Sequence, residues 1–359
     1  MLIQPERHTA QVLPRVHVSG VATANPSHVL HQAEVARRAG ELFAGALKSF
    51  DRLRPVYENA EIATRYSCVP ISWYQEVHSF ADRNALYLKH AVDLLEQVAV
   101  EAVTAAGRGL EEIDGLVVVS TSGIATPSLD ALLMERLRLK RTMERLPVFG
   151  LGCAGGVLGL ARTAQMARSR PGALYLFLVV ELCGLTFRSQ DFSKSNVVAT
   201  ALFGDGAAGA LVGTGVEGAE ILHHGEHTWP DTLDIMGWDL GDDGLSVIFS
   251  RDIPTHVRTM LRGALADYLE RTGDCRDDIV HVLSHPGGAK VLDALEEILD
   301  LPGGGLTHSR QVLRDFGNMS AATVMFVLAA AQRDGLAGRT LLTTLGPGFT
   351  AGFLTMNLR

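Results

Sequence analysis

The 359-residue sequence has few cysteines, no long hydrophobic run and no N-terminal hydrophobic stretch typical of a signal peptide. None of its four cysteines forms a CxxC pair, so we expect neither a disulfide framework nor a zinc site, and no other metal. The most apolar run, residues 173–180, is too short to span a bilayer. These absences predict a cytoplasmic protein with reduced thiols and no membrane span.

Aromatic residues make up only 6% of the chain, whereas 47% of its residues are hydrophobic. This composition predicts a large interior packed from aliphatic side chains, alanine and glycine. The formal net charge of −8 argues against nucleic acid as the main partner, because phosphate backbones bind to basic surfaces. A local basic patch for a small anionic substrate is still compatible with that charge.

Short apolar runs alternate with helical patterns along the chain, which is typical of an α/β fold with buried, largely parallel strands. Strands are expected at residues 16–22, 116–120, 173–180, 207–212 and 281–284, and helices at residues 31–50, 81–106, 129–139 and 321–332.

Two further patterns are given little weight. Residues 204–209 fit the GxGxxG pattern but run into a strand-like stretch rather than a helix, so we do not expect a dinucleotide site. The cluster of histidines and a glutamate at residues 223–227 is interpreted as a solvated loop, because no further ligand set accompanies it.

The second half of the chain repeats the plan of the first. A strand pattern at residues 117–120 precedes a Leu-Asp-Ala-Leu tetrapeptide that begins at Leu129, and a strand pattern at 281–284 precedes a second copy that begins at Leu292. Such a repeat predicts two similar units packed about a pseudo-twofold axis. The two halves are residues 1–214 and residues 215–359.

A cysteine and an asparagine occupy matching places in these halves. The first tetrapeptide begins 24 residues before Cys153 and the second begins 26 residues before Asn318. Each of the two residues follows a glycine and opens an alanine-rich helix. The N-terminal end of a helix carries partial positive charge, which favours a thiolate, so the pKa of Cys153 is predicted to be lowered. His285 follows the strand at 281–284, where open α/β sheets place their chemistry. The three form a coherent catalytic set: a nucleophile, its imidazole partner and a neutral oxyanion donor.

Five motifs stand in the order and approximate spacing of the type III polyketide synthases, the chalcone synthase-like family, which the chain resembles over nearly its whole length. The motifs lie at residues 152–156, 203–208, 285–288, 317–320 and 346–350. The resemblance implies the thiolase fold, in which two pseudo-symmetric halves build five αβαβα layers, and a homodimer. It also implies acyl-CoA and malonyl-CoA substrates without a further cofactor, and it makes Cys153, His285 and Asn318 the catalytic triad.

Residues 237–242 and 250–254 are similar to those of bacterial alkylpyrone and alkylresorcinol synthases. This similarity implies a CoA-dependent acyltransferase that loads a fatty acyl starter on Cys153. It would extend that starter by iterative decarboxylative condensation with malonyl-CoA and then cyclise an alkylpyrone or alkylresorcinol. The residues implied to line its cavity are Thr186, Phe203, Trp238, Val247 and Gly348.

The resemblance also assigns Arg52 to the phosphates of CoA. Two other basic positions of the family fall near Pro55 and Asn59, which carry no charge. The candidates to replace them are Lys48, Arg54 and Arg65. Delivery of the starter by an acyl carrier protein is the alternative.

Three other interpretations stay open. A ketoacyl-carrier-protein synthase III would use the same triad for a single condensation. A hydroxymethylglutaryl-CoA synthase would need a carboxylate base near the cysteine, and none stands out, since Glu181 is interpreted as a structural hydrogen-bond acceptor. A non-catalytic scaffold subunit with the thiolase fold would have no need of an intact triad.

Overall fold

The computed structural model describes residues 13–43, 50–301 and 305–359. Within them, nine strands form one sheet in the order β11-β12-β13-β8-β1-β7-β6-β4-β5. The strands are β1 (Val16–Ala24), β4 (Gly115–Val119), β5 (Glu144–Val148), β6 (Leu174–Leu182), β7 (Asp205–Gly213), β8 (Ala219–Thr228), β11 (His281–Ser284), β12 (Gly338–Gly346) and β13 (Thr350–Leu358).

The sheet has the same strand relations on both sides of its middle. On one side β1 pairs with β7 and β7 with β6, both antiparallel, and β6 pairs with β4 in parallel. On the other side β8 pairs with β13 and β13 with β12, both antiparallel, and β12 pairs with β11 in parallel. An antiparallel ladder between β1 and β8 joins the two sides. The expected duplication is therefore confirmed in the strand order.

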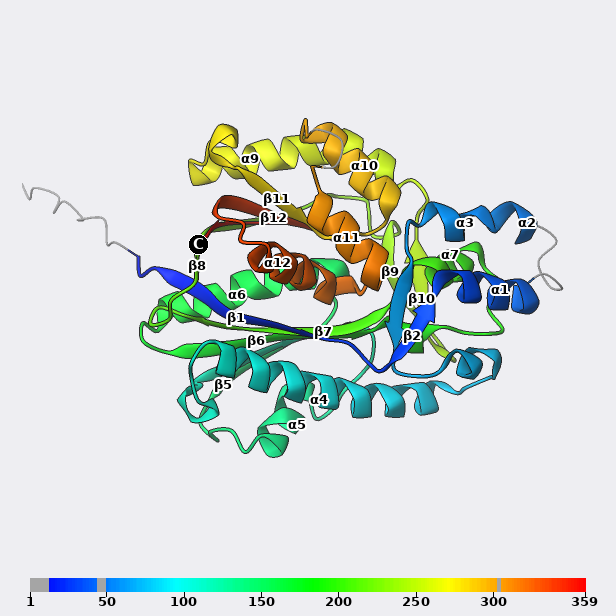
Figure 1. Cartoon of the computed structure of the whole chain (residues 1–359), viewed down its shortest axis with the longest axis horizontal. Coiled ribbons are helices and arrows are strands. Elements are labelled where there is room, and N and C mark those ends of the chain that lie inside the picture. Colours follow the sequence, from blue (N-terminus) through cyan, green and yellow to red (C-terminus); the bar gives the residue numbers. More distant parts are fainter. Residues whose placement is uncertain (1–12, 44–49, 302–304) are drawn as a thin grey trace, which may run out of the picture.

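Helices form three layers with the two sides of the sheet between them (Figure 1). The outer layers are α4 (Phe80–Ala105) with α5 (Leu129–Arg136) on one side and α9 (Arg262–Thr272) with α10 (Ala289–Ile298) on the other. The middle layer holds α6 (Gly155–Ser169) and α12 (Thr323–Arg333), which contact strands of both halves. This is the predicted αβαβα arrangement, and the two Leu-Asp-Ala-Leu repeats lie in α5 and α10.

The long helix α4 illustrates how the sequence forms these layers. Ser79 caps it: the Ser79 hydroxyl accepts a hydrogen bond from the Asp82 backbone N–H at 3.1 Å, and the Asp82 carboxylate accepts one from the Ser79 backbone N–H at 3.3 Å. The apolar face of the helix, which includes Ala91, Leu95 and Val98, is fully buried, and the helix packs on β1, β7 and β6. The expected helix at 81–106 is confirmed to within a residue at each end.

Shorter elements gather at one end of the layers (Figure 1). They are the helices α1 (Gln32–Phe43), α2 (Phe50–Leu53), α3 (Pro55–Asn59), α7 (Lys194–Leu202) and α8 (Ile253–His256), the two-stranded sheets β2 (His28–His31) with β3 (Thr64–Ser67) and β9 (Met236–Gly241) with β10 (Gly244–Phe249), and the short helical turns η1 (Ile71–Gln75) and η4 (Cys183–Thr186). These elements supply most of the cavity walls described below. The helix α11 (Thr307–Phe316) lies among the layers instead, in contact with α10 and α12.

One expected loop is wrong. The histidine-rich stretch 223–227 lies in β8, in the middle of the sheet, because its antiparallel ladder with β13 holds it extended whatever its side chains are. Across the described residues, no three His, Cys, Asp or Glu side chains are grouped so that they could hold a metal ion. No helix in the described part of the chain is long and apolar enough to cross a membrane.

Candidate active site

The two matching helix starts meet at the centre of the molecule. Cys153 lies in a single 3-10 turn, η3 (Gly152–Ala154), that leads into α6. Asn318 lies two residues before the equivalent turn, η7 (Ser320–Ala322), which leads into α12 and contacts η3. His285 follows β11 directly. All three side chains line one cavity of about 760 Å³, here called the central cavity.

Contacts from distant segments position Cys153. The Thr344 hydroxyl donates to the Cys153 carbonyl at 2.7 Å, and the thiol donates to the Ser320 hydroxyl with an S···O distance of 3.6 Å. Gly152 has a φ of +47°, and a Cβ added there would lie 2.6 Å from the ring of Pro347. A glycine is therefore needed before the cysteine, both for the left-handed backbone and for the close approach of Pro347.

The Asn318 amide is held in one orientation. Its Nδ2 donates to the Gly287 carbonyl at 3.2 Å, and its Oδ1 accepts from the Ser320 backbone N–H at 2.8 Å. The His285 backbone N–H donates to the Thr343 carbonyl at 2.9 Å. Within the described residues neither ring nitrogen of His285 has a hydrogen-bond partner, although the residue is only 4% exposed. The imidazole therefore has free hydrogen-bonding capacity inside the cavity.

Burial is the largest influence on the pKa values of Cys153 and His285. It raises the pKa of Cys153 to about 12, although hydrogen bonds to Ser320 and Asn318 act in the opposite direction. It lowers the pKa of His285 to about 3. The predicted lowering of the Cys153 pKa is therefore wrong, because desolvation of the thiolate outweighs the field of a helix start. Both groups are neutral near pH 7, so ionisation of the thiol requires a receiving base.

Glu181 is a buried carboxyl that the sequence analysis placed outside the catalytic set. It lies on β6, is 0% exposed, and accepts a hydrogen bond from the Thr121 backbone N–H at 3.1 Å. Burial raises its pKa to about 7, against the lowering effect of hydrogen bonds from Ser122, Thr121 and Ser320. The Ser320 hydroxyl thus acts to lower the pKa of both Glu181 and Cys153. The only sequence signal for Glu181 is an acidic residue at the end of an apolar strand.

The raised pKa predicts how stability depends on pH. A carboxyl with a folded pKa of about 7 and an ordinary value of 4.5 ionises more readily in the unfolded chain, so it destabilises the fold as the pH rises from 4.5 to 7. The cost is about 3 kcal/mol above pH 7. We expect urea unfolding of the wild type to show this decline and Glu181→Gln to lack it. If the two proteins lost stability equally as the pH rises, the raised pKa of Glu181 would be wrong. Burial also raises the pKa of Asp205 to about 6, but Asp205 is present in both proteins, so its effect cancels in the comparison.

Three of the predicted cavity residues border a second space. Phe203, Trp238 and Val247 line the central cavity and also a neighbouring side cavity of about 840 Å³. Trp238 and Val247 face each other across the β9–β10 ladder, and the Phe203 and Trp238 rings lie 6.4 Å apart. Phe203, Trp238 and Val247 therefore form a shared wall between the two spaces. Thr186 lines the side cavity but not the central one.

Gly348 lines neither space. Its carbonyl accepts a hydrogen bond from the Thr232 hydroxyl at 3.1 Å, and the residue before it, Pro347, lines the central cavity instead. The prediction for Gly348 is therefore wrong, because the turn, with a φ of +76° at Gly348, directs the proline rather than the glycine toward Cys153.

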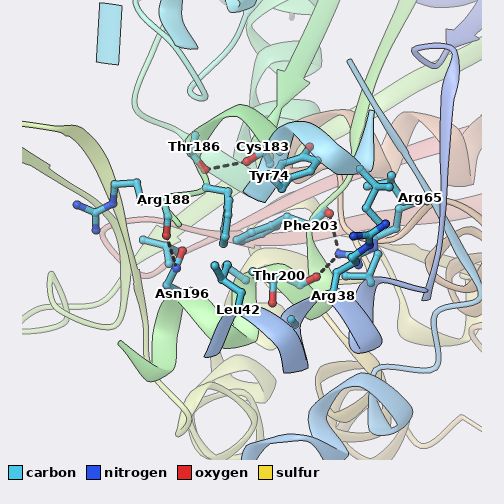
Figure 2. Close-up of a pocket in the computed structure, with 18 of the residues that line it drawn as sticks. Arg38, Leu42, Arg65, Tyr74, Cys183, Thr186, Arg188, Asn196, Thr200 and Phe203 are labelled. Carbon is cyan, nitrogen blue, oxygen red and sulfur yellow. Dashed lines mark hydrogen bonds between the residues drawn. The ribbon is translucent and has the colours of Figure 1, made fainter. Parts of the chain in front are cut away.

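The side cavity lies between α1, α7 and the turns η1 and η4 (Figure 2). Most of its wall is apolar, formed by Leu30, Val35, Ala39, Leu42, Phe43, Ile71, Phe187, Ala199 and Leu245. Two polar groups in the wall already have partners. The Thr186 hydroxyl donates to the Cys183 carbonyl at 2.7 Å, and the Asn196 amide donates to the carbonyls of Arg188 and Asp191 at 3.0 and 2.7 Å. The space therefore suits an apolar group.

Arg52 lines a third, outer cavity of about 1310 Å³, which shares Phe249, Ile253, Gly287 and Val291 with the central cavity. Of the candidates to accompany it, Lys48 lies outside the described residues, and Arg54 is not part of this wall. Arg65 is 2% exposed, and its guanidinium donates to the Gln32 side chain. It also donates to the carbonyls of Thr200 and Phe203 (Figure 2). Arg65 is therefore a structural residue rather than a phosphate ligand.

Comparison with known proteins agrees with this geometry. The family model of the chalcone and stilbene synthases matches residues 14–216 with its N-terminal domain and residues 221–357 with its C-terminal domain. A 1,3,6,8-tetrahydroxynaphthalene synthase of Streptomyces peucetius subsp. caesius is 37% identical over 98% of this chain and 95% of its own. A 3,5-dihydroxyphenylacetyl-CoA synthase of Amycolatopsis balhimycina is 30% identical over 83% of each.

Among solved structures, the tetrahydroxynaphthalene synthase of Streptomyces coelicolor A3(2), a bacterial type III polyketide synthase, has a TM-score of 0.91 at 27% identity and covers 96% of this chain and 99% of its own. The chain belongs to the chalcone and stilbene synthase family and has its thiolase fold. It is a type III polyketide synthase, a CoA-dependent acyltransferase that condenses malonyl-CoA iteratively with an acyl-CoA starter.

Proposed function

We propose that this polyketide synthase extends a fatty acyl starter and cyclises the chain to an alkylpyrone or alkylresorcinol. The observation that carries this proposal is the apolar side cavity, which adjoins the central cavity at Phe203, Trp238 and Val247. An aliphatic chain of several carbons attached to Cys153 needs an apolar space beyond the reacting centre, and burial of each methylene stabilises it by about 0.8 kcal/mol.

We propose that loading of the starter begins with proton transfer from Cys153 to a ring nitrogen of His285. The free nitrogens of His285 support this step, because the buried thiol needs a local base. The sulfur attacks the thioester carbonyl, the bond from that carbonyl to the CoA sulfur breaks, and CoA leaves as the thiol with the proton from His285. The acyl group is then held on Cys153.

Extension uses the two hydrogen-bond donors in the same cavity. Loss of CO2 from malonyl-CoA leaves its bonding electron pair as an enolate, whose oxygen accepts hydrogen bonds from His285 and Asn318. The enolate carbon attacks the acyl carbonyl, and the bond to Cys153 breaks with its electrons returning to sulfur. The product is two carbons longer and attached to CoA. Decarboxylation supplies the carbanion, so no base has to remove a C–H proton.

The test is a product assay with the purified protein, malonyl-CoA and acetyl-, hexanoyl- or palmitoyl-CoA, followed by mass spectrometry. We expect pyrone or resorcinol products that carry the longer starters. β-Keto products of one extension would indicate a ketoacyl synthase III-type enzyme, and no product with any starter would favour a scaffold. Formation of 1,3,6,8-tetrahydroxynaphthalene without use of any starter would replace the fatty acyl proposal with the product named for the Streptomyces relatives.

The shared wall gives a second test. Val247→Phe adds a ring where the two cavities meet, so we expect kcat/KM for palmitoyl-CoA to fall at least about tenfold relative to that for acetyl-CoA, because overpacking costs about 1–3 kcal/mol. Val280→Phe is the matched control, since Val280 is 61% exposed and outside all three cavities. An unchanged ratio of the two starters in Val247→Phe would reject the role of this wall.

A further inference from the structure

The outer cavity adjoins the central cavity that contains Cys153. The two spaces share four wall residues. Its rim is built from α2, α3, the start of α7, the segment after β10 and the start of α10. A thioester whose carbonyl reaches Cys153 would therefore leave the distal part of its carrier in the outer cavity.

The basic residues in this cavity differ from those that the family resemblance implies. Pro55 and Asn59, which stand at two of the implied basic positions, do line the outer cavity, but they carry no charge. Arg65, which was a candidate replacement, is buried and holds Gln32 and two backbone carbonyls. On the α2–α3 side, Arg52 is thus the one cation among the lining residues that the structure describes.

Three other cations line the same cavity from other segments of the chain. Lys194 stands at the first position of α7, Arg251 follows β10, and Lys290 lies in the first turn of α10. All three are exposed, and among the described residues that line this cavity there is no Asp or Glu. Segments far apart in the sequence thus bring four positive charges to one opening in a chain whose net charge is −8.

Ion pairs with the described residues hardly involve these four charges. Arg52, Lys194 and Lys290 have no ion-pair partner among the described residues, and Arg251 has a single long contact of 3.9 Å to its neighbour Asp252. Other surface arginines are closely paired; for example, Arg136 lies 2.7 Å from Asp93 and 2.8 Å from Glu96. Lysine and arginine side chains without partners around a concave opening favour a phosphate-bearing ligand.

We propose that Lys194, Arg251 and Lys290 act with Arg52 to hold the phosphates of CoA thioesters, in place of the cations missing at positions 55 and 59. The inference rests on the proposed function in taking CoA as the carrier, and it adds that α2, α7, the β10–α8 segment and α10 hold the phosphates jointly. The pantetheine arm then passes Phe249 and Gly287 to reach Cys153.

The test compares CoA with 3′-dephospho-CoA, which lacks one phosphate, by calorimetry on the full chain. We expect the wild type to prefer CoA by about tenfold, and the triple variant Lys194→Ala/Arg251→Ala/Lys290→Ala to bind CoA at least about tenfold more weakly with a preference below about twofold. The affinity of the wild type for CoA should also fall steeply with added salt. Lys89→Ala on α4 is the matched control, an exposed lysine outside the outer cavity.

Two outcomes would overturn the proposal. If the triple variant bound CoA as tightly as the wild type and preferred it over 3′-dephospho-CoA to the same extent, these cations would not hold the phosphates. Unchanged CoA affinity together with lost turnover of a carrier-protein-bound starter would assign the rim to an acyl carrier protein instead. Lys290→Gln, a single exposed change, gives the same comparison if the triple variant unfolds. Because binding is measured without turnover, failure to form an alkylpyrone would reject the proposed product and leave this result intact.

Discussion

Cys153→Ala is expected to lower the rate of chain extension by at least about 10³-fold, because the variant has no nucleophile to carry the acyl group. Decarboxylation of malonyl-CoA should persist within about tenfold of the wild-type rate, since His285 and Asn318 still hold the enolate oxygen. Mass spectrometry of the intact protein after incubation with acyl-CoA, together with measurement of released CO2, separates the two steps.

Two variants sharpen this result. Asn318→Leu removes an enolate donor, so it should lose decarboxylation and extension together while the protein is still acylated on Cys153. Cys275→Ala changes an exposed cysteine outside the three cavities and should behave as the wild type. An acylated and extending Cys153→Ala protein would disprove the assignment of the nucleophile.

Gly156→Ala is expected to destabilise the fold by at least about 1–3 kcal/mol. A Cβ at position 156 would lie 2.3 Å from the Ala321 carbonyl oxygen and 2.5 Å from Val324, so α6 and α12 would have to separate. These helices carry the turns that hold Cys153 and Ser320, so we also expect a loss of kcat. The free energy of unfolding in urea and the extension rate at saturating substrate measure the two effects.

Gly263→Ala provides the matched control for this change. Gly263 is also a helical glycine, in α9, but a Cβ there meets no atom within 4 Å. Alanine should therefore stabilise this helix, by up to about 1 kcal/mol, through a smaller loss of backbone entropy on folding. If Gly156→Ala were as stable as Gly263→Ala, the close contact between the two helix starts would be wrong.

Much of the fold could be predicted because its signals are local or repeated. The apolar runs of β1, β4, β6, β7 and β11 and the stripe of α4 follow directly from side-chain period. The repeated Leu-Asp-Ala-Leu tetrapeptides predicted the duplication that the strand order confirms. Strand β8 escaped prediction because its histidines have no apolar alternation, and its pairing with β13 and β1 supplies what its composition lacks.

The candidate active site was likewise predictable only in part. Cys153, His285 and Asn318 stand in motifs whose glycines mark the turns, so their convergence could be expected from the matched halves. The wall between the central and side cavities brings Trp238 of β9, Val247 of β10 and Phe203, which follows α7, together. Sequence spacing alone does not report such a volume. Lys194 and Lys290 stand in no motif, and Arg251 lies in the 250–254 motif with no role of its own predicted. Only the cavity that the three residues share singles them out.

By itself, the sequence determined the architecture, the family and the three side chains at the centre, because hydrophobic period, duplication and glycine-flanked motifs are properties of short stretches. Tertiary structure alone decided the environment of those side chains. It raised the pKa of Cys153 where a helix start predicted the opposite, made Arg65 structural, and turned Gly348 away from the cavity. The physical reason is that desolvation, charge compensation and cavity shape depend on neighbours from distant parts of the chain.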